Sequence, residues 1–236
     1  MDPLFFVPLL VISWLTPLIL RFMPKLTAIE FINRLTGLRS DPNDANFSGV
    51  KMGSIFVLGK EFAQMPVAEI EKLIESPTPK IRVGALSIMG QCAKGKKCSE
   101  ERLKDLYELY IRRHDLIDDW GLVDLAAYYV VGQYLANKPR DILYKLARSE
   151  NQWERRTAIV ATAHFILKLK QVDDTFKIAE ILAHDPEKFV QTGTGWMVRA
   201  AGDVDRPALI AFLDKHAATM PRILLRYSIE KLAQAV

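Results

Sequence analysis

Apolar residues recur along this chain three and four positions apart, which is the spacing of one face of a helix. Residues 26–35 show this pattern and end before Gly37, a polar loop with Asp41-Pro42-Asn43-Asp44 follows, and residues 52–62 show it again. Pro66 then begins a further helical segment at residues 67–74. Later in the chain no useful length of residues alternates between apolar and polar as a strand would. The pattern therefore predicts an all-α protein.

A longer period lies over the helical one. Small residues recur at matching places of the helical pattern, about 33 to 37 residues apart or about twice that. A spacing of this size is the period of two-helix repeats. The residues are Ala85, Ala158, Gly195 and Ser228. Turn signals precede the corresponding helices, at Ser76-Pro77-Thr78-Pro79, Ser149-Glu150-Asn151, Asp185-Pro186 and Pro221. Small residues let neighbouring helices approach closely, and each unit buries its face only by stacking on the next. We expect a HEAT-like solenoid, a superhelix of helical repeats.

One carboxylate stands out in the middle of the chain. Asp118 and Asp119 are good N-cap residues, so a helix is expected to begin at Trp120 and to place Asp124 on the same face one turn later. The residues around Asp124 are apolar, and an aspartate there costs helix propensity and desolvation. Asp124 should therefore have either a structural partner, such as a helix N-terminus or an arginine, or a functional role. Helical periodicity does not choose between these.

The chain begins with an apolar segment, Pro3–Leu20, that contains no charged residue and is followed by Arg21. Its length suits a membrane span with the rest of the chain in the cytoplasm, although prolines interrupt it. The alternatives are an upstream extension of the reading frame, with Met23 as an internal start, and an apolar helix docked on the domain. We divide the chain into an N-terminal segment, 1–23, and a repeat domain, 24–236.

The composition and the placement of cysteines and histidines bear on whether the protein holds a metal or a cofactor. Hydrophobic residues make up 50% of the chain and charged residues 25%, as in a folded protein. Two cysteines, Cys92 and Cys98, form neither a disulfide framework nor a metal site, and free thiols are expected. The four histidines have neither metal-ligand spacing nor triad partners, and the helix dipole is expected to favour His114 at a helix C-terminus. We therefore expect neither a metal nor an organic cofactor.

A formal net charge of +4 and a pI near 9.0 hint at a polyanionic partner, and the placement of the basic residues strengthens the hint. They lie at or near the start of the second helix of each repeat, where helix N-termini and arginines together suit phosphate groups. The candidate DNA-binding residues are Lys80, Arg82, Arg113, Arg155, Arg199, Arg222 and Arg226.

Three blocks of sequence, in this order, resemble the AlkD-type DNA alkylation-repair glycosylases, a family built of HEAT-like repeats. The resemblance runs from about Ile29 to the C-terminus and leaves Pro3–Leu20 outside. Its blocks are Asp119-Trp120-Gly121-Leu122-Val123-Asp124, Asn151-Gln152-Trp153-Glu154-Arg155-Arg156-Thr157-Ala158-Ile159-Val160 and Phe189-Val190-Gln191-Thr192-Gly193-Thr194-Gly195-Trp196-Met197-Val198-Arg199.

The resemblance implies a role for four residues. Asp124 matches the family's essential carboxylate and Trp120 the aromatic one turn before it. Arg156 matches the arginine that helps to hold the lesion-bearing backbone, and Trp196 matches the second aromatic of the cleft. The chain departs from the family pattern at Gly121, where an aspartate is more usual, and in the glycine-rich start of the Trp196 helix. Trp153 is expected to pack between helices.

The activity that the resemblance implies is hydrolysis of the N-glycosidic bond of N3- or N7-alkylated purines, without a cofactor, while the lesion stays in the duplex. The partner would be duplex DNA that carries alkylated bases. We expect a monomer in the cytoplasm, with a membrane tether if Pro3–Leu20 inserts. Two rival interpretations are a non-catalytic protein that binds DNA structure and a helical scaffold that binds an acidic protein.

Overall fold

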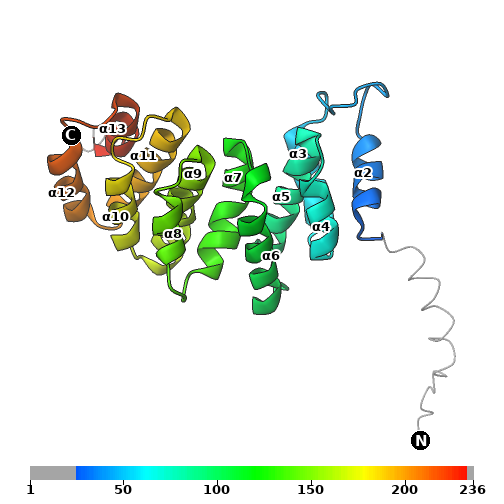
Figure 1. Cartoon of the computed structure of the whole chain (residues 1–236), viewed down its shortest axis with the longest axis horizontal. Coiled ribbons are helices and arrows are strands. Elements are labelled where there is room, and N and C mark those ends of the chain that lie inside the picture. Colours follow the sequence, from blue (N-terminus) through cyan, green and yellow to red (C-terminus); the bar gives the residue numbers. More distant parts are fainter. Residues whose placement is uncertain (1–24, 233–236) are drawn as a thin grey trace, which may run out of the picture.

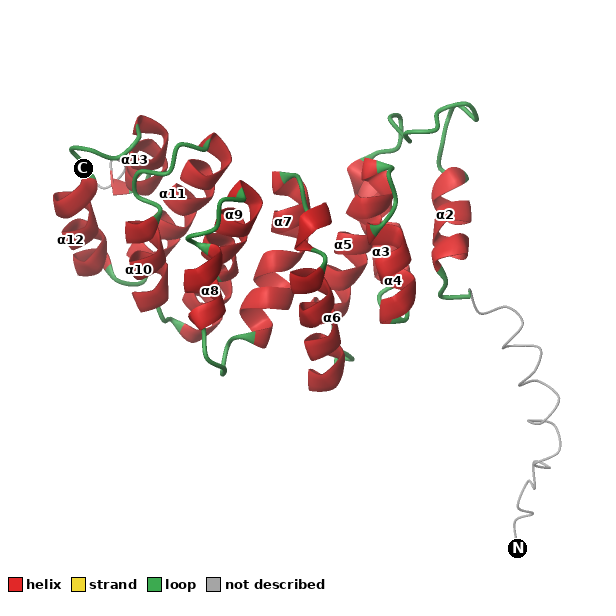
Figure 2. Ribbon diagram, viewed as in Figure 1, coloured by secondary structure: helices red, strands yellow, loops and turns green. Residues whose placement is uncertain are grey.

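The computed structural model describes residues 25–232, and within this range every regular element is a helix (Figure 2). The helices form two rows that alternate along the chain (Figure 1). The outer row consists of α2 (Ala28–Thr36), α4 (Val67–Ile74), α6 (Glu100–Arg112), α8 (Asp141–Leu146), α10 (Asp173–Ile181) and α12 (Arg206–His216). The inner row consists of α3 (Met52–Glu61), α5 (Pro79–Lys94), α7 (Trp120–Ala126), α9 (Gln152–Ala161), α11 (Lys188–Gly202) and α13 (Arg222–Ile229). The predicted all-α, HEAT-like architecture is confirmed.

The two rows have different packing. Each inner helix lies directly against the next one, from α3 through to α13, whereas neighbouring outer helices contact one another less. The rows are curved, and the inner helices lie on the hollow side of the curve (Figure 1). Short irregular turns join the rows: a 3-10 turn after α6 (η2, His114–Leu116) and π-helical turns that continue α7 (η3, Ala127–Gly132) and α9 (η4, Phe165–Leu169). Side chains of consecutive inner helices are therefore close neighbours.

Helix boundaries follow the local signals in the sequence. The segments predicted at residues 26–35, 52–62 and 67–74 are α2, α3 and α4. Asp119 caps α7 by accepting a hydrogen bond of 2.7 Å from the backbone N–H of Gly121, and Asn151 caps α9 by accepting one of 2.9 Å from that of Trp153. These caps satisfy N–H groups that have no partner within the helix. The predicted start of a helix at Trp120 is confirmed.

Small residues set the distance between inner helices. A Cβ atom at Gly195 would lie 2.6 Å from Cβ of Tyr227 on the next inner helix, and Ala85 and Ala158 are fully buried. The sequence pattern pointed to these positions. It did not point to Gly90, where a side chain would collide with the carbonyl group of Leu125 on α7. Close helix contact therefore depends on glycine at more positions than the repeat period indicates.

The apolar segment Pro3–Leu20 lies outside the described residues. From residue 25 to residue 232, no helix combines the length and the apolar character that a membrane crossing requires. The division of the chain at residue 23 stays a prediction.

Candidate functional site

The predicted carboxylate Asp124 is paired with the predicted arginine Arg156. Arg156 Nε donates to Asp124 Oδ1 at 3.1 Å and Arg156 Nη2 donates to Asp124 Oδ2 at 2.8 Å. Each residue lies five positions after the N-cap of its helix, Asp119 for α7 and Asn151 for α9, so the repeat brings the two side chains to the same level of adjacent inner helices. Asp124 therefore has the structural partner that its apolar surroundings require.

The two partners differ in their exposure. The Arg156 side chain is 1% exposed and that of Asp124 is 28% exposed. Arg156 Nη1 also donates to the backbone carbonyl of Phe189, at the start of α11. Arg156 thus lies beneath the surface with its guanidinium directed at protein acceptors, while Asp124 remains accessible from outside. The role in holding a DNA backbone that the resemblance implies for Arg156 is not visible in this arrangement and stays a prediction.

The two predicted aromatic residues lie near this pair. Trp120, the first residue of α7, is 45% exposed and precedes Asp124 by one helical turn. The ring centroid of Trp196 is 5.8 Å from Cζ of Arg156, and its ring meets Tyr227 edge-on at 5.9 Å. Cation–π contact of this kind favours the placement of Trp196 beside the arginine. The four predicted catalytic residues thus come from three adjacent inner helices, α7, α9 and α11.

A glycine explains how α11 fits against Arg156. A Cβ atom at Gly193 would lie 3.0 Å from Arg156 Nη1, which is closer than a side chain normally approaches. The glycine-rich start of α11, which departs from the family pattern, therefore leaves room for the guanidinium. Trp153 packs against the core, and its ring centroid lies 5.6 Å from that of Phe189. Its predicted packing role is confirmed.

A buried polar group supports α9 from the outer row. Thr157, the residue after Arg156, has its Oγ1 atom 2.8 Å from Tyr110 Oη and 2.9 Å from His114 Nε2. Burial raises the pKa of the Tyr110 hydroxyl and lowers the pKa of His114. His114 lies directly after the end of α6, as expected, but its removal from water disfavours the charged form of the ring. Sequence analysis missed this group, for which the only signal is a threonine within an otherwise apolar helix face.

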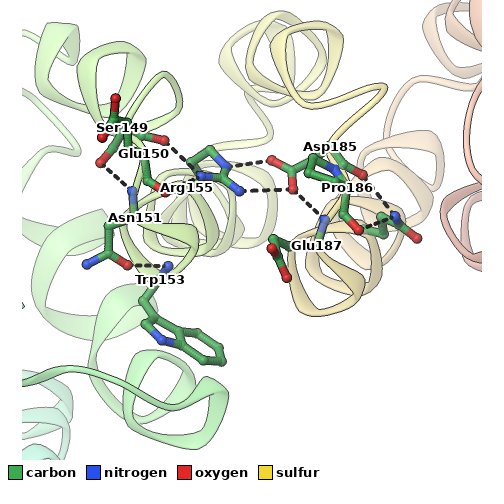
Figure 3. A network of polar contacts seen from close by, with 9 residues as sticks. Ser149, Glu150, Asn151, Trp153, Arg155, Asp185, Pro186 and Glu187 are labelled. Carbon is green, nitrogen blue, oxygen red and sulfur yellow. Dashed lines mark hydrogen bonds and ion pairs between the residues drawn. The ribbon is translucent and has the colours of Figure 1, made fainter.

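Two of the predicted DNA-binding arginines join adjacent repeats in the same way. Arg155 donates to both carboxylate oxygens of Asp185, at 2.6 and 3.2 Å, and to the backbone carbonyl groups of Ser149 and Glu150 (Figure 3). Arg82 donates to both carboxylate oxygens of Asp118, at 3.0 and 2.9 Å, and to the backbone carbonyl of Ser76. In each case the arginine binds the carbonyl six residues before it and an aspartate ahead of the next inner helix.

The other predicted DNA-binding residues fall into two groups. Arg113 is paired with Glu71, Glu75 and Asp115, Arg199 is paired with Glu230, and Lys80 donates to the carbonyl of Val50 at 3.2 Å. Arg222 and Arg226 are exposed, and they line a surface cavity of about 430 Å³ at the end of the inner row. The structure therefore leaves these last two side chains open to solvent, while most of the others share their charge with a carboxylate. The phosphate-binding role of the set stays a prediction.

Free thiols at Cys92 and Cys98 are as predicted, with the two Sγ atoms 3.9 Å apart. Burial and the neighbouring Cys92 raise the pKa of Cys98 to about 12. Across residues 25–232 no three histidine, cysteine or acidic side chains are grouped as a metal site would need.

The profile of the DNA alkylation repair enzyme family matches residues 22–232. The chain belongs to this family. The match spans the helices that carry Trp120, Asp124, Arg156 and Trp196. No curated protein sequence matches the chain. A role in DNA alkylation repair follows from the family.

Proposed function

We propose that this member of the DNA alkylation repair family is a DNA glycosylase that releases N3- or N7-alkylated purines from duplex DNA. The observation that carries the proposal is the Asp124 carboxylate, which is held by two hydrogen bonds from a buried arginine and is still 28% exposed. A fixed, accessible carboxylate beside exposed aromatic surface is what the chemistry of a cationic base requires.

The chemistry starts from a favourable leaving group. A purine alkylated at N3 or N7 carries positive charge, and its departure leaves oxocarbenium character on the deoxyribose. A carboxylate already in place stabilises that charge without reorganising in the transition state, and it can position the attacking water. Arg156 keeps Asp124 in one orientation through both oxygens, so it acts as a positioning residue.

The aromatic residues favour a charged base over a neutral one. Trp120 is 45% exposed and stands one turn from Asp124, so its ring is available to a cationic base or sugar. Such contacts are worth about 0.5 to 2 kcal/mol each. Trp196 lies deeper, beside Arg156. Selectivity by charge needs no closed pocket around the base, which is consistent with action on a base that stays in the duplex.

The Asp124→Asn variant tests the proposal. Asparagine keeps the shape and one acceptor oxygen, so the helical circular dichroism and duplex binding should persist, with some loss of stability because Arg156 loses its charged partner. Release of N7-methylguanine from duplex, measured by chromatography of the free base, should fall at least about a hundredfold. Asp214→Asn, which makes the same charge change at an exposed position on α12, is the control and should leave base release unchanged.

Undiminished base release by a folded Asp124→Asn protein would contradict the role of this carboxylate. Duplex binding without base release by the unaltered chain would favour a non-catalytic protein that binds DNA structure. Failure to bind duplex at any salt concentration would favour the protein-binding scaffold. We further propose that the protein acts in the cytoplasm.

A further inference from the structure

Four lysines that have no carboxylate partner lie together at a place that the sequence analysis did not single out. Lys60, Lys94, Lys96 and Lys97 are all exposed, and within residues 25–232 none of them lies in ion-pair contact with an acidic side chain. Together with Ala63, Gln64, Gln91 and Gly95 they line one open cavity of about 700 Å³. This lining, called here the lysine pocket, contains no carboxylate. The predicted DNA-binding residues Arg82, Arg113, Arg155 and Arg199, by contrast, are each paired with a carboxylate.

The charge of the lysine pocket exceeds what the helix ends require. Lys60 and Lys94 lie in the last turns of α3 and α5, where a cation offsets the partial negative charge of the helix C-terminus. Two helix ends contribute about −1 elementary charge in total. Four lysines carry four positive charges, so the pocket retains a clear positive excess. An anion is the ligand that it suits, and the amide side chains of Gln64 and Gln91 add hydrogen-bond donors.

A chain of contacts connects the lysine pocket with the candidate site. Lys94 Nζ lies 5.7 Å from the ring centroid of Tyr129, and the rings of Tyr129 and Tyr128 are 4.3 Å apart. Tyr128 follows Asp124 by four residues, about one helical turn. The pocket and the site are therefore parts of one continuous surface on the inner row of helices.

The distance between them suits a duplex. Gly90 of α5 packs against Leu125 of α7, next to Asp124, and Gly59 of α3 packs against Ser87 of α5. Lys60 on α3 is thus two inner helices away from Asp124, whereas Lys94 lies at the end of α5, the inner helix next to α7, and Lys96 and Lys97 follow it. Adjacent packed helices are about 8 to 10 Å apart, so the pocket extends from about 8 to about 20 Å from the helix of Asp124. Phosphates of one DNA strand are spaced about 3.4 Å apart along the axis, so this range corresponds to about two to six base pairs.

We propose that the lysine pocket, formed by Lys60, Lys94, Lys96 and Lys97, binds backbone phosphates of the duplex about two to six base pairs to one side of the nucleotide at Asp124. The register relative to the lesion rests on the proposed glycosylase function. The anion-binding character of the pocket does not. The pocket supplies affinity without sequence preference and leaves the chemistry to Asp124.

The test compares two variants that remove two lysines each. In Lys96→Gln/Lys97→Gln the change is in the pocket, and in Lys145→Gln/Lys177→Gln it is at exposed positions of the outer helices α8 and α10. Binding to a duplex of about 20 base pairs containing N7-methylguanine is measured by fluorescence anisotropy over a range of salt concentrations. Each lost phosphate contact lowers the magnitude of the slope of log affinity against log salt by about 0.9. The slope should therefore fall by about 2 in the pocket variant and stay unchanged in the outer variant.

Two duplexes with the lesion near one end or near the other locate the contact. Only the duplex that extends over the pocket should respond to Lys96→Gln/Lys97→Gln. Single-turnover base release is measured with the same proteins and duplexes. An absence of base release in every protein, with the salt slope still lowered by the pocket variant, would reject the glycosylase function and retain the pocket.

Three results would overturn the proposal. The first is an unchanged salt slope in the pocket variant, and the second is an equal loss of slope in both variants, which would show a general effect of net charge. The third is unchanged duplex binding together with weaker binding to vesicles of phosphatidylglycerol and phosphatidylcholine, which would assign the pocket to a membrane surface.

Discussion

Arg156 is a charged side chain with 1% of its surface exposed, and every acceptor it uses belongs to the protein. Removing such a group from water is costly unless its partners replace the lost hydration, and a carboxylate with a backbone carbonyl does so here. The pair constrains both members: Arg156 is directed away from solvent, and Asp124 has both oxygens engaged on one side. A water or a sugar that approaches from outside meets a carboxylate of fixed orientation.

His114 makes the stability of the protein depend on pH. Burial lowers the pKa of His114 from its usual value of 6.5, so the unfolded chain binds a proton more readily than the folded one. The free energy of unfolding should therefore be fully retained well above pH 6.5 and should fall as the pH drops through that value. Urea unfolding at pH 8 and at pH 5.5 should show a larger loss for the unaltered protein than for His114→Gln.

Two features keep this measurement specific. Carboxyl groups with lowered pKa values, such as Asp44 and Glu69, titrate below the range used. His164, whose pKa burial also lowers, is present in both proteins and cancels in the difference. His184→Gln, at an exposed histidine, serves as the control and should behave as the unaltered chain does. Equal losses for the unaltered protein and His114→Gln would show that His114 is not the group responsible.

At the scale of the element, two inner helices are each joined to the next inner helix by an arginine. The arginine binds a backbone carbonyl in the loop before its own helix and an aspartate in the loop before the next inner helix. Arg82 makes this bridge between α5 and α7, and Arg155 makes it between α9 and α11 (Figure 3 shows the second). The bridges differ in burial, because the Asp185 side chain is 4% exposed and that of Asp118 is 55% exposed. Their contributions to stability should differ accordingly.

We expect Arg155→Gln to lower the free energy of unfolding by about 3 to 5 kcal/mol, because it leaves the buried Asp185 without its charged partner. Arg82→Gln should cost about 1 kcal/mol or less, because water can solvate Asp118. Urea unfolding of both variants at pH 8 provides the comparison. Similar losses in the two would mean that the difference in burial does not decide the strength of the bridge. A lowered DNA salt slope in Arg155→Gln would in addition support its predicted phosphate contact.

At the scale of the whole molecule, every residue assigned to the site or to DNA binding lies from Lys60 onward, and the family profile begins at residue 22. We therefore predict that a chain starting at Met23 keeps its helical circular dichroism and releases alkylated base as fast as the full chain. The full chain should sediment with membranes if Pro3–Leu20 inserts, since burial of its apolar side chains in lipid is favourable.

Both chains are expressed in the same host and compared by fractionation, circular dichroism and base release. Aggregation or loss of activity in the shorter chain, with a full chain that stays out of the membrane fraction, would show that the segment docks on the domain. The boundary at residue 23 would then be wrong.

The sequence alone determined the features that depend on near neighbours in the chain. Asp119 caps α7 through Gly121, two residues away, and Trp120 and Asp124 share a face because an α-helix turns once in about 3.6 residues. The period of small residues at Ala158 and Gly195 indicated stacked repeats for the same reason, since each unit repeats the same local pattern. Resemblance to a family then pointed to Arg156 and Trp196.

Only the tertiary structure decided which distant groups meet. That Asp124 pairs with Arg156, that Arg155 is bound to Asp185, and that His114 is buried against Thr157 all depend on how one repeat stacks on the next. The sequence shows that these residues are charged or polar, but their partners lie about thirty or more residues away, so local periodicity does not identify them. Lys60 and Lys94 likewise come together because α3 packs against α5. Whether a basic residue is free to bind a phosphate is decided by these contacts, because a nearby carboxylate already offsets its charge.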